Sequence, residues 1–172
     1  ELVAIESHRD APGREKPCAE KIAQTFSKWG MEYKIATVLE DRPNVTCTLK
    51  GSGGGMSLMF NGHIDTVPAY EMEIPPFKPE VRDGNLYGRG TVDMKGQLAC
   101  MMVAMRMLRD LGVPLKGDLT FAAVINEEDR SEGTEYLVRN GPHADRCVVG
   151  EPTSLVIHVG HRGLEWLEFE FI

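Results

Sequence analysis

The chain has 172 residues, of which 42% are hydrophobic and 26% are charged. This length and composition suit one globular domain with a single core. The net charge of -7 argues against a nucleic-acid partner and against an anionic membrane surface, because both favour basic patches. No apolar run approaches the roughly 20 residues of a membrane-spanning helix, so we expect no membrane association.

The cysteines give no sign of a zinc ribbon or a redox motif, because they lie far apart and form no Cys-x-x-Cys pair. They are Cys18, Cys47, Cys100 and Cys147. The first residues show no charged start followed by an apolar signal core, and we expect a cytoplasmic protein. Because the chain opens at Glu1 rather than at methionine, we also expect that it has been trimmed or processed upstream.

The first predicted element is an amphipathic helix over residues 16–29. Its apolar residues recur at helical spacing, and Gly30 follows as a stop signal. These apolar residues are Ala19, Ile22, Ala23, Phe26 and Trp29. Residues 33–38 and 44–49 are rich in β-formers and predict two strands. The glycine-rich run at residues 51–55 lacks the Lys-Ser/Thr of a phosphate-binding loop, so we expect a hairpin turn before a strand at residues 58–60.

A second helix is predicted over residues 95–111, with apolar side chains at helical spacing and most of its surface buried. Residues 119–125 form a continuous apolar run, as expected for a central strand covered on both faces. Residues 147–149 supply one more short apolar run. Strands that alternate with helices predict an α/β fold with three layers, in which a mixed, mostly parallel sheet is flanked by helices.

Side chains of the types that commonly bind metal ions follow these predicted strands in the sequence. His63 comes after the run at 58–60, Glu127 and Glu128 follow the run at 119–125, and Glu151 follows the run at 147–149. In open α/β sheets, ligands bind beyond the carboxyl ends of the strands. Asp93 lies in a glycine-containing loop before the second helix. Converging carboxylates need a positive charge among them, and a pair of divalent metal ions is the obvious candidate.

Four segments carry a resemblance to a known family. They read N-G-H-I-D-T-V-P at residues 61–68, Y-G-R-G-T-V-D-M-K-G at 87–96, E-E at 127–128 and G-E-P-T at 150–153. They closely resemble the dinuclear zinc amidohydrolases and peptidases that include acetylornithine deacetylase, succinyl-diaminopimelate desuccinylase, aminoacylase and carboxypeptidase G. The resemblance covers nearly the whole chain, in order and at familiar spacings.

The resemblance implies a role for each metal-type residue. His63 and Glu151 would hold one zinc ion, Asp93 would bridge two, and Glu128 would bind the second. Asp65 would hold the His63 imidazole in the right tautomer, as carboxylates commonly do beside zinc-bound histidine. The implied cofactors are two Zn²⁺ ions, with Co²⁺ or Mn²⁺ as substitutes.

Glu127 is implied to be the general base. It would take a proton from a water between the metals, and would later protonate the leaving amine. The implied reaction is hydrolysis of an amide bond in an N-acyl amino acid or short peptide, as in the deacetylase and desuccinylase branch. Aminoacylase, dipeptidase and carboxypeptidase activities stay open, as does an inactive fragment or non-catalytic metal-binding module.

Simpler interpretations apply to other polar residues. Lone histidines are more often structural or solvated than ligands, and we interpret His8, His143 and His158 in that way. We expect Asp129, Glu132 and Glu135 to be solvated surface acids. No Gly-x-Ser-x-Gly elbow is present, which argues against a serine hydrolase. Asn126 stands where the family more usually has acidic or small residues, and we expect no change of mechanism from it.

The sequence ends before the family pattern is complete. Members carry a lid or dimerisation domain and a further metal-binding histidine near the C-terminus. We expect residues 1–162 to be the N-terminal part of the catalytic domain, and residues 163–172 to be the first strand of the lid, so that the chain is truncated there. A homodimer through the lid is implied for the complete protein. We expect this chain alone to bind at most one metal tightly and to hydrolyse little.

Overall fold

The computed structural model describes residues 1–161, 163 and 170. The strand expected at residues 163–172 lies almost wholly outside the described residues, so the division at residue 162 stays a prediction. In the described part of the chain, no helix is long and apolar enough to cross a membrane.

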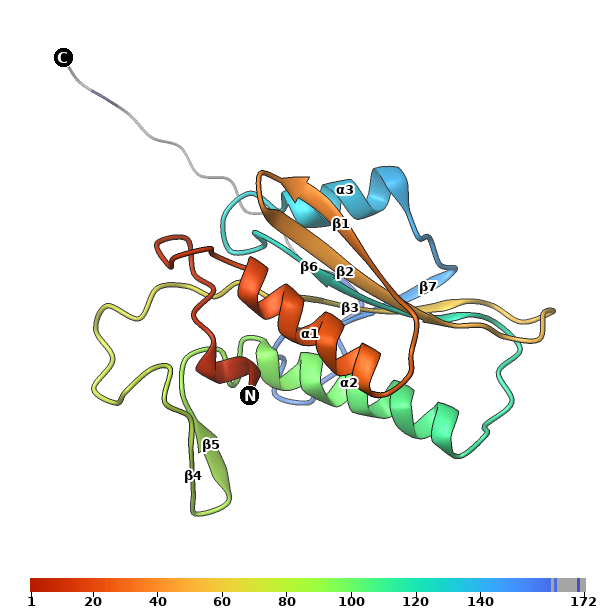
Figure 1. Cartoon of the computed structure of the whole chain (residues 1–172), viewed down its shortest axis with the longest axis horizontal. Helices are drawn as coiled ribbons and strands as arrows, with labels where there is room; N and C mark the ends of the chain where they lie inside the picture. Colours follow the sequence, from red (N-terminus) through yellow and green to blue (C-terminus); the bar gives the residue numbers. More distant parts are fainter. Residues whose placement is uncertain (162, 164–169, 171–172) are drawn as a thin grey trace.

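Within the described residues, five strands form the main sheet, in the order β1-β2-β6-β3-β7 (Figure 1). Their bounds are Tyr33–Leu39 for β1, Arg42–Leu49 for β2, Leu58–His63 for β3, Leu119–Val124 for β6 and Arg146–Val149 for β7. Strand β3 runs parallel to both β6 and β7, whereas β2 runs antiparallel to β1 and β6. The expected mixed sheet is therefore confirmed, with β2 as the reversed strand.

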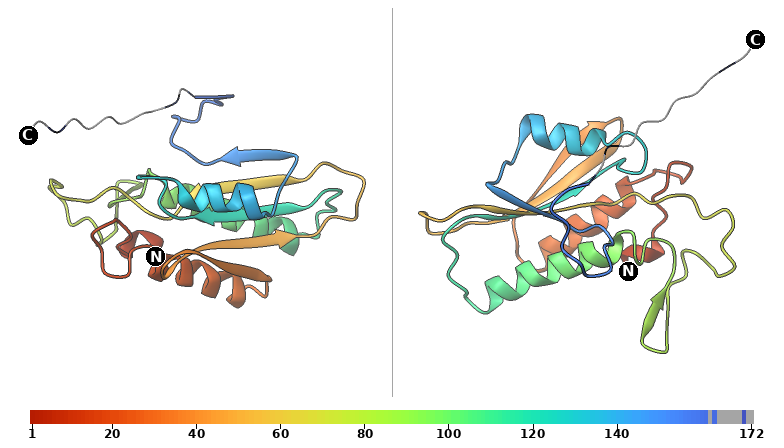
Figure 2. Two further views of the ribbon diagram at one scale, coloured as in Figure 1. Left: turned by 90° about the horizontal axis from the view of Figure 1, so that it is seen from above. Right: turned by 180° about the vertical axis from the view of Figure 1, so that it is seen from behind.

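Helices cover both faces of this sheet (Figure 2). On one face, α1 (Lys16–Lys28) and α2 (Lys95–Asp110) pack on the side chains of Phe121 and Ala123. On the other face, α3 (Glu132–Asn140) brings Leu137 onto Ala122 and Val124. Because side chains alternate along a strand, the buried run of β6 serves both layers at once. This arrangement confirms the three-layer architecture and the central place of β6.

The glycine-rich run at residues 51–55 does not form the expected hairpin turn, because β6 lies between β2 and β3 in the sheet. It forms a connection that passes against residues 115–117, where the amides of Ser52 and Gly53 donate to the carbonyls of Leu115 and Lys116. A Cβ on Gly51 would lie 2.5 Å from the Gly117 carbonyl oxygen. The glycines therefore permit a close approach of two backbones.

Several elements escaped prediction. A short 3-10 helix η1 spans Leu2–Ala4, and a small hairpin pairs β4 (Glu80–Arg82) with β5 (Asn85–Tyr87). Helix α3 was also missed. Helix α2 was expected to be buried on most of its surface, and this is wrong, because Val103 and Met107 on its outer face are exposed.

Candidate metal centre

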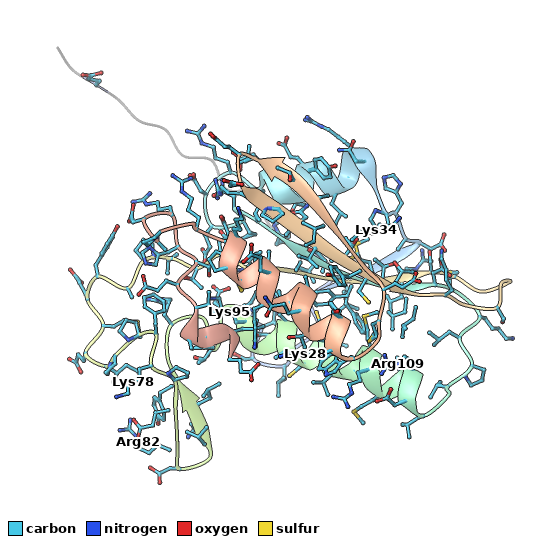
Figure 3. The ribbon with its side chains drawn as sticks, viewed as in Figure 1. Lys28, Lys34, Lys78, Arg82, Lys95 and Arg109 are labelled. Atoms are coloured by element: carbon cyan, nitrogen blue, oxygen red, sulfur yellow. The ribbon has the colours of Figure 1, made fainter. Side chains whose placement is uncertain are left out.

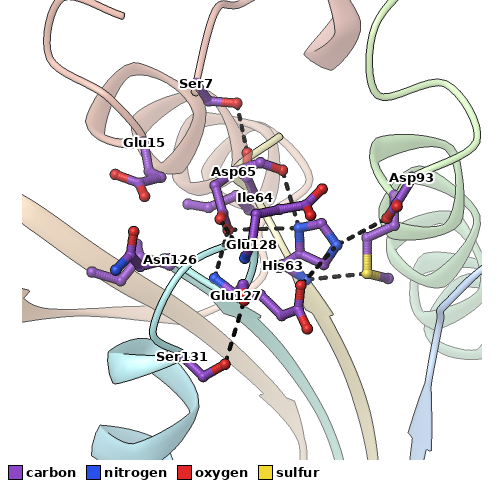
Figure 4. Close-up of polar contacts among 12 residues, drawn as sticks. Ser7, Glu15, His63, Ile64, Asp65, Asp93, Asn126, Glu127, Glu128 and Ser131 are labelled. Atoms are coloured by element: carbon purple, nitrogen blue, oxygen red, sulfur yellow. Dashed lines mark hydrogen bonds and ion pairs between the residues drawn. The ribbon is translucent and has the colours of Figure 1, made fainter. Parts of the chain in front are cut away.

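The three neighbouring strands β6, β3 and β7 bring four of the five candidate residues, all but Asp93, to one end of the sheet. Figure 4 shows His63, Glu127 and Glu128 near one another there. His63 is the last residue of β3 and pairs in register with Val124, the last residue of β6. Glu127 and Glu128 follow β6 closely, and Glu151 follows β7. Because these strands are parallel, their carboxyl ends coincide and their following loops meet above His63.

The imidazole of His63 is only 1% exposed and lies at the centre of the acidic cluster. Its Nε2 lies 3.0 Å from Asp93 Oδ1, 3.5 Å from Glu151 Oε1 and 3.8 Å from Glu127 Oε2. Glu128 comes to the same place, since its ligand atom lies within 4.8 Å of those of His63 and Asp93. All the candidate metal ligands therefore converge.

Two groups of residues could each hold one ion, because the ligand atoms within each group all lie within 4.8 Å of one another. One group is His63, Asp93 and Glu128, and the other is His63, Glu127 and Glu151. The grouping differs from the sequence expectation, which joined Asp93 and Glu151 around His63 and kept Glu127 out of the ligand set. Both groups share the single imidazole, so the structure describes one compact acidic site with His63 at its base.

Asp65 contacts both His63 and the glutamate pair. The Nδ1 atom of His63 donates to the backbone carbonyl of Asp65 at 3.0 Å and lies 3.6 Å from its carboxylate. The same carboxylate accepts two backbone hydrogen bonds, from the amide of Glu127 at 3.1 Å and from that of Glu128 at 3.0 Å. Asp65 therefore orients the imidazole through its backbone carbonyl and anchors the glutamate pair through its buried carboxylate.

The loop that carries Asp93 is fixed by close packing. Gly90 has a φ of +81°, a left-handed conformation that favours glycine. Met94 is completely buried, and its sulfur accepts the backbone N–H of His63 at 3.2 Å. A Cβ on Gly62 would lie 2.3 Å from the terminal methyl group of Met94. Glycine at position 62 thus allows α2 and its preceding loop to approach β3.

The electrostatics of the cluster follow from crowded carboxylates. Burial disfavours a charged imidazole, but contacts with Asp65 and Asp93 and the charge of Glu151 outweigh burial and raise the pKa of His63 to about 11. Burial and the neighbouring carboxylates, opposed by His63, raise the pKa of Glu151 to about 7. Burial and the charge of Asp93 likewise raise the pKa of Glu128. These shifts reflect acids that lack a sufficient positive charge.

The donor set suits a divalent metal ion. One imidazole nitrogen and several carboxylate oxygens meet at one point, and zinc binds such nitrogen and oxygen ligands. A metal ion would supply the positive charge that the proton on His63 now provides, and would need that nitrogen deprotonated. The residues present therefore fit a metal ion, on the chemistry of their side chains.

The N-terminal segment makes hydrogen bonds next to His63 and at the start of α2, close to Asp93. These contacts were not predicted from the sequence. Ser7 Oγ donates to the carbonyl of Ile64 at 2.7 Å, between His63 and Asp65. Lys95, at the start of α2, is 1% exposed and its Nζ donates to the carbonyl of Ile5 at 2.6 Å (Figure 3). Burial lowers the pKa of Lys95. In the sequence, the only sign of this contact was a lysine, Lys95, at the start of a helix that was expected to be buried. Nothing in the sequence marked Ser7.

An imidazole and several carboxylates gathered at the carboxyl ends of the strands of a mixed sheet define an α/β domain with a candidate metal site. The particular family is given by sequence comparison. The model of peptidase family M20/M25/M40 matches residues 59–170, and the chain belongs to this family. The family expected from the four sequence segments is thereby confirmed.

Individual relatives are similar over most of this chain. An N-formyl-4-amino-5-aminomethyl-2-methylpyrimidine deformylase of Halalkalibacterium halodurans is 37% identical over 85% of this chain and 36% of its own length. A probable succinyl-diaminopimelate desuccinylase of Staphylococcus epidermidis is 32% identical over 95% of this chain and 40% of its own length. The chain thus spans 36% to 40% of the length of these two relatives.

The fold is also shared with solved structures. An M20 family metallo-carboxypeptidase from Sulfolobus solfataricus superposes with a TM-score of 0.72, covering 87% of this chain and 35% of that protein. At 18% identity, this likeness concerns the fold alone. It agrees with the mixed sheet and the flanking helices described above.

Proposed function

We propose that the protein is a metal-dependent hydrolase that cleaves the amide bond of an N-acyl amino acid or a short peptide. The observation that carries this proposal is the convergence of His63 with Asp93, Glu127, Glu128 and Glu151 at one sheet edge. The residues of this cluster come from four separate segments: the end of β3, the loop before α2, the turn after β6 and the segment after β7.

The proposed metals are two divalent ions, with zinc as the first choice for this donor set and Co²⁺ or Mn²⁺ as substitutes. His63, Asp93 and Glu151 would hold one ion, while Asp93 and Glu128 would hold the other. In support, the His63 Nε2 atom is 3.0 Å from Asp93 and 3.5 Å from Glu151. When bound, the ions would polarise the amide carbonyl and make water more acidic.

Glu127 is proposed as the general base. Its carboxylate lies 3.8 Å from His63 Nε2 and so faces the same point as the proposed ligands. There it would accept a proton from the attacking water and then deliver that proton to the leaving amine nitrogen. Asp65 would take no proton itself, since its oxygens are occupied by the amides of Glu127 and Glu128.

The substrate class rests on the relatives. One is named a deformylase and another a probable desuccinylase, and both names denote the removal of an acyl group. We therefore propose an acyl group on nitrogen as the part of the substrate that is cleaved.

The test is an assay of amine release from N-formyl, N-acetyl and N-succinyl amino acids and from dipeptides, with the intact protein. We expect turnover that EDTA abolishes and Zn²⁺ or Co²⁺ restores. Glu135→Gln, which changes an exposed acid on α3, is the matched control and should keep full activity. Metal binding without turnover of any of these substrates would instead identify a non-catalytic metal-binding module.

Other expectations from the sequence stay predictions. These are a further histidine ligand and a lid beyond this chain, a homodimer through that lid, weak activity of this chain alone, and a cytoplasmic location. Gel filtration, metal analysis and the amine-release assay, applied to the intact protein and to the 172-residue chain, would test the first three.

A further inference from the structure

A buried polar chain lies beside the acidic cluster and belongs to none of its proposed ligands. Arg42 Nε donates to Glu15 Oε2 at 2.7 Å, and its Nη2 donates both to Glu15 Oε1 and to Asn126 Oδ1. Asn126 Nδ2 then donates to the carboxylate of Glu132. Glu15, Arg42 and Asn126 are 1%, 8% and 5% exposed. Figure 4 labels Glu15 and Asn126 in the same view as Asp65 and the glutamate pair.

The four residues come from four different elements. Glu15 precedes α1, Arg42 begins β2, Asn126 lies just after β6, and Glu132 begins α3. Glu132 was expected to be a solvated surface acid, and this is wrong, because its carboxylate is half-buried against Asn126. The polar chain therefore joins elements on both faces of the sheet to the turn that follows its central strand.

The side-chain amide of Asn126 suits its two partners in this chain, because it both accepts from Arg42 and donates to Glu132. Arg42 has donors and no acceptor, so the atom that faces it must be an oxygen. Glu132 as a carboxylate only accepts, so the atom that faces it must donate. An aspartate at position 126 would satisfy Arg42 but would place a second carboxylate against Glu132.

Asn126 also shapes the backbone of the turn. Its φ is +59°, a left-handed conformation that asparagine tolerates better than most residues. Its carbonyl accepts from the amides of Arg130 at 3.2 Å and Ser131 at 2.6 Å. Directly after it, the amides of Glu127 and Glu128 point to the carboxylate of Asp65. The turn is thus held by Asp65 on one side and by the buried polar chain on the other.

We propose that Arg42 and Asn126 are positioning residues for the candidate base Glu127 and the candidate ligand Glu128. The roles of these two glutamates rest on the proposed function, whereas the positioning rests on the contacts above. Arg42 fixes the Asn126 side chain, which fixes the left-handed turn, and the turn aims both glutamates at His63. A buried ion pair alone would contribute little net stability, but one tied to this turn sets the geometry of the site.

The test reverses the direction of the hydrogen bond between the side chains at positions 126 and 132. Asn126→Asp alone sets two carboxylates against each other, whereas the double variant Asn126→Asp with Glu132→Gln restores a donor facing an acceptor and keeps the net charge of the pair. Glu132→Gln alone retains an acceptor and is the mild control. Leu137→Ala, on α3 but outside the polar chain, is the control for a general loss of stability.

Three quantities are measured in the intact protein: the affinity for Co²⁺, kcat and KM with an N-acyl amino acid, and hydrogen exchange of the amides of Glu127 and Glu128. We expect Asn126→Asp to weaken the weaker Co²⁺ site and lower kcat, each about tenfold, since small displacements of positioned groups have effects of this size. KM should change less than kcat, and exchange should accelerate. The double variant should return all three towards wild type.

The proposal is overturned if Asn126→Asp leaves these quantities unchanged, if the double variant restores none of them, or if Leu137→Ala at equal loss of Tm changes them as much. Should Asn126→Asp not fold, Arg42→Lys replaces it, because lysine keeps the charge but cannot bind Glu15 through a fork. Failure of the proposed function is seen separately, as a wild-type protein without turnover or Co²⁺ binding. In that case, hydrogen exchange alone decides whether the turn is positioned as proposed.

Discussion

The carboxylate of Asp65 accepts the backbone amide of Glu127 at 3.1 Å, although 62 positions separate the two residues in the chain. Its second oxygen accepts the amide of Glu128, and the carbonyl of Asp65 accepts His63 Nδ1. The loop after β3 and the loop after β6 are thus joined through one side chain. The imidazole and the glutamate pair consequently keep a fixed relation to each other.

Asp65→Asn should disrupt both loops. An amide offers one acceptor oxygen in place of two, so one of the two glutamate amides would face an N–H group and lose its partner. We expect a loss of about 1–3 kcal/mol in the free energy of unfolding and metal binding weaker by about 10–100-fold. Urea unfolding and a Zn²⁺ titration would measure these effects.

The matched control is Asp145→Asn. Asp145 also accepts a backbone amide, that of Ser57 at 2.7 Å, but lies away from the cluster. Both contacts of the Asp145 carboxylate with Ser57 use one oxygen, which asparagine retains, so this variant should leave metal affinity unaltered. If Asp65→Asn bound Zn²⁺ as tightly as wild type, the carboxylate of Asp65 would have no part in holding the site.

Glu127→Gln separates base from ligand. Glutamine keeps the shape of the side chain but cannot accept a proton at neutral pH, so we expect retention of both metals with a loss in kcat of about 10²–10⁴-fold. Elemental analysis and steady-state kinetics would measure this. Loss of one metal equivalent, with Glu128→Gln losing only kcat, would mean that the two glutamates have exchanged roles.

Glu151→Gln should weaken one metal site. A neutral amide oxygen replaces a carboxylate that lies 3.5 Å from His63 Nε2, and charge contributes much of carboxylate affinity for a divalent ion. We expect one equivalent of Zn²⁺ to be lost on dialysis against a weak chelator, while the other is retained. An unchanged zinc content would remove Glu151 from the ligand set.

Metal binding should release protons in a pH-dependent number. His63, whose pKa is raised to about 11, is protonated in the metal-free protein at pH 8 and must lose that proton to bind a metal. Glu151, whose pKa is raised to about 7, is ionised at pH 8 but largely protonated at pH 6. We therefore expect release of about one proton at pH 8 and about two at pH 6, with affinity falling as the pH falls.

Calorimetry in buffers of different ionisation enthalpy would count these protons. A Zn²⁺ titration that releases no proton at either pH would contradict the charge distribution described for the cluster. Equal release at both values would instead exclude Glu151 as a group that titrates between them.

Gly62→Ala should be poorly tolerated. Its Cβ would lie 2.3 Å from Met94 Cε and 2.9 Å from Leu98 Cδ2, and both side chains are fully buried. We expect a loss of about 1–3 kcal/mol, typical of overpacking, with weaker metal binding because Met94 adjoins Asp93. Gly160→Ala, where an added Cβ meets nothing within 4 Å, is the control. Equal Tm values for the two variants would contradict this packing.

Much of the architecture could be predicted because the signals are local. The apolar run of β6 and the periodic apolar face of α1 mark their elements without knowledge of partners. The glycine-rich run was misassigned because strand order is non-local, and nothing in residues 51–55 reveals that β6 inserts beside β2. Helix α3 was missed because its buried face amounts to little more than Gly133 and Leu137.

The residues of the candidate site could also be predicted from local signals, whereas the contacts that support them could not. Four short segments pointed to His63, Asp93, Glu127, Glu128 and Glu151 through a family resemblance, and the structure brings these residues together. The supporting contacts could not be predicted, because each joins distant positions. Arg42 and Asn126 are 84 positions apart, and no spacing rule relates them. Whether an acid such as Glu132 is solvated or paired is decided by its three-dimensional neighbours.

We propose that two metal ions bind at this end of the sheet in a fixed arrangement around Glu127. Anomalous diffraction at the zinc edge, from crystals of the intact protein grown with Zn²⁺, tests it most directly. We predict two peaks, one bound by His63, Asp93 and Glu151 and the other by Asp93 and Glu128, with Glu127 bound to neither. A single peak, or an ion bound directly by Glu127, would contradict the account.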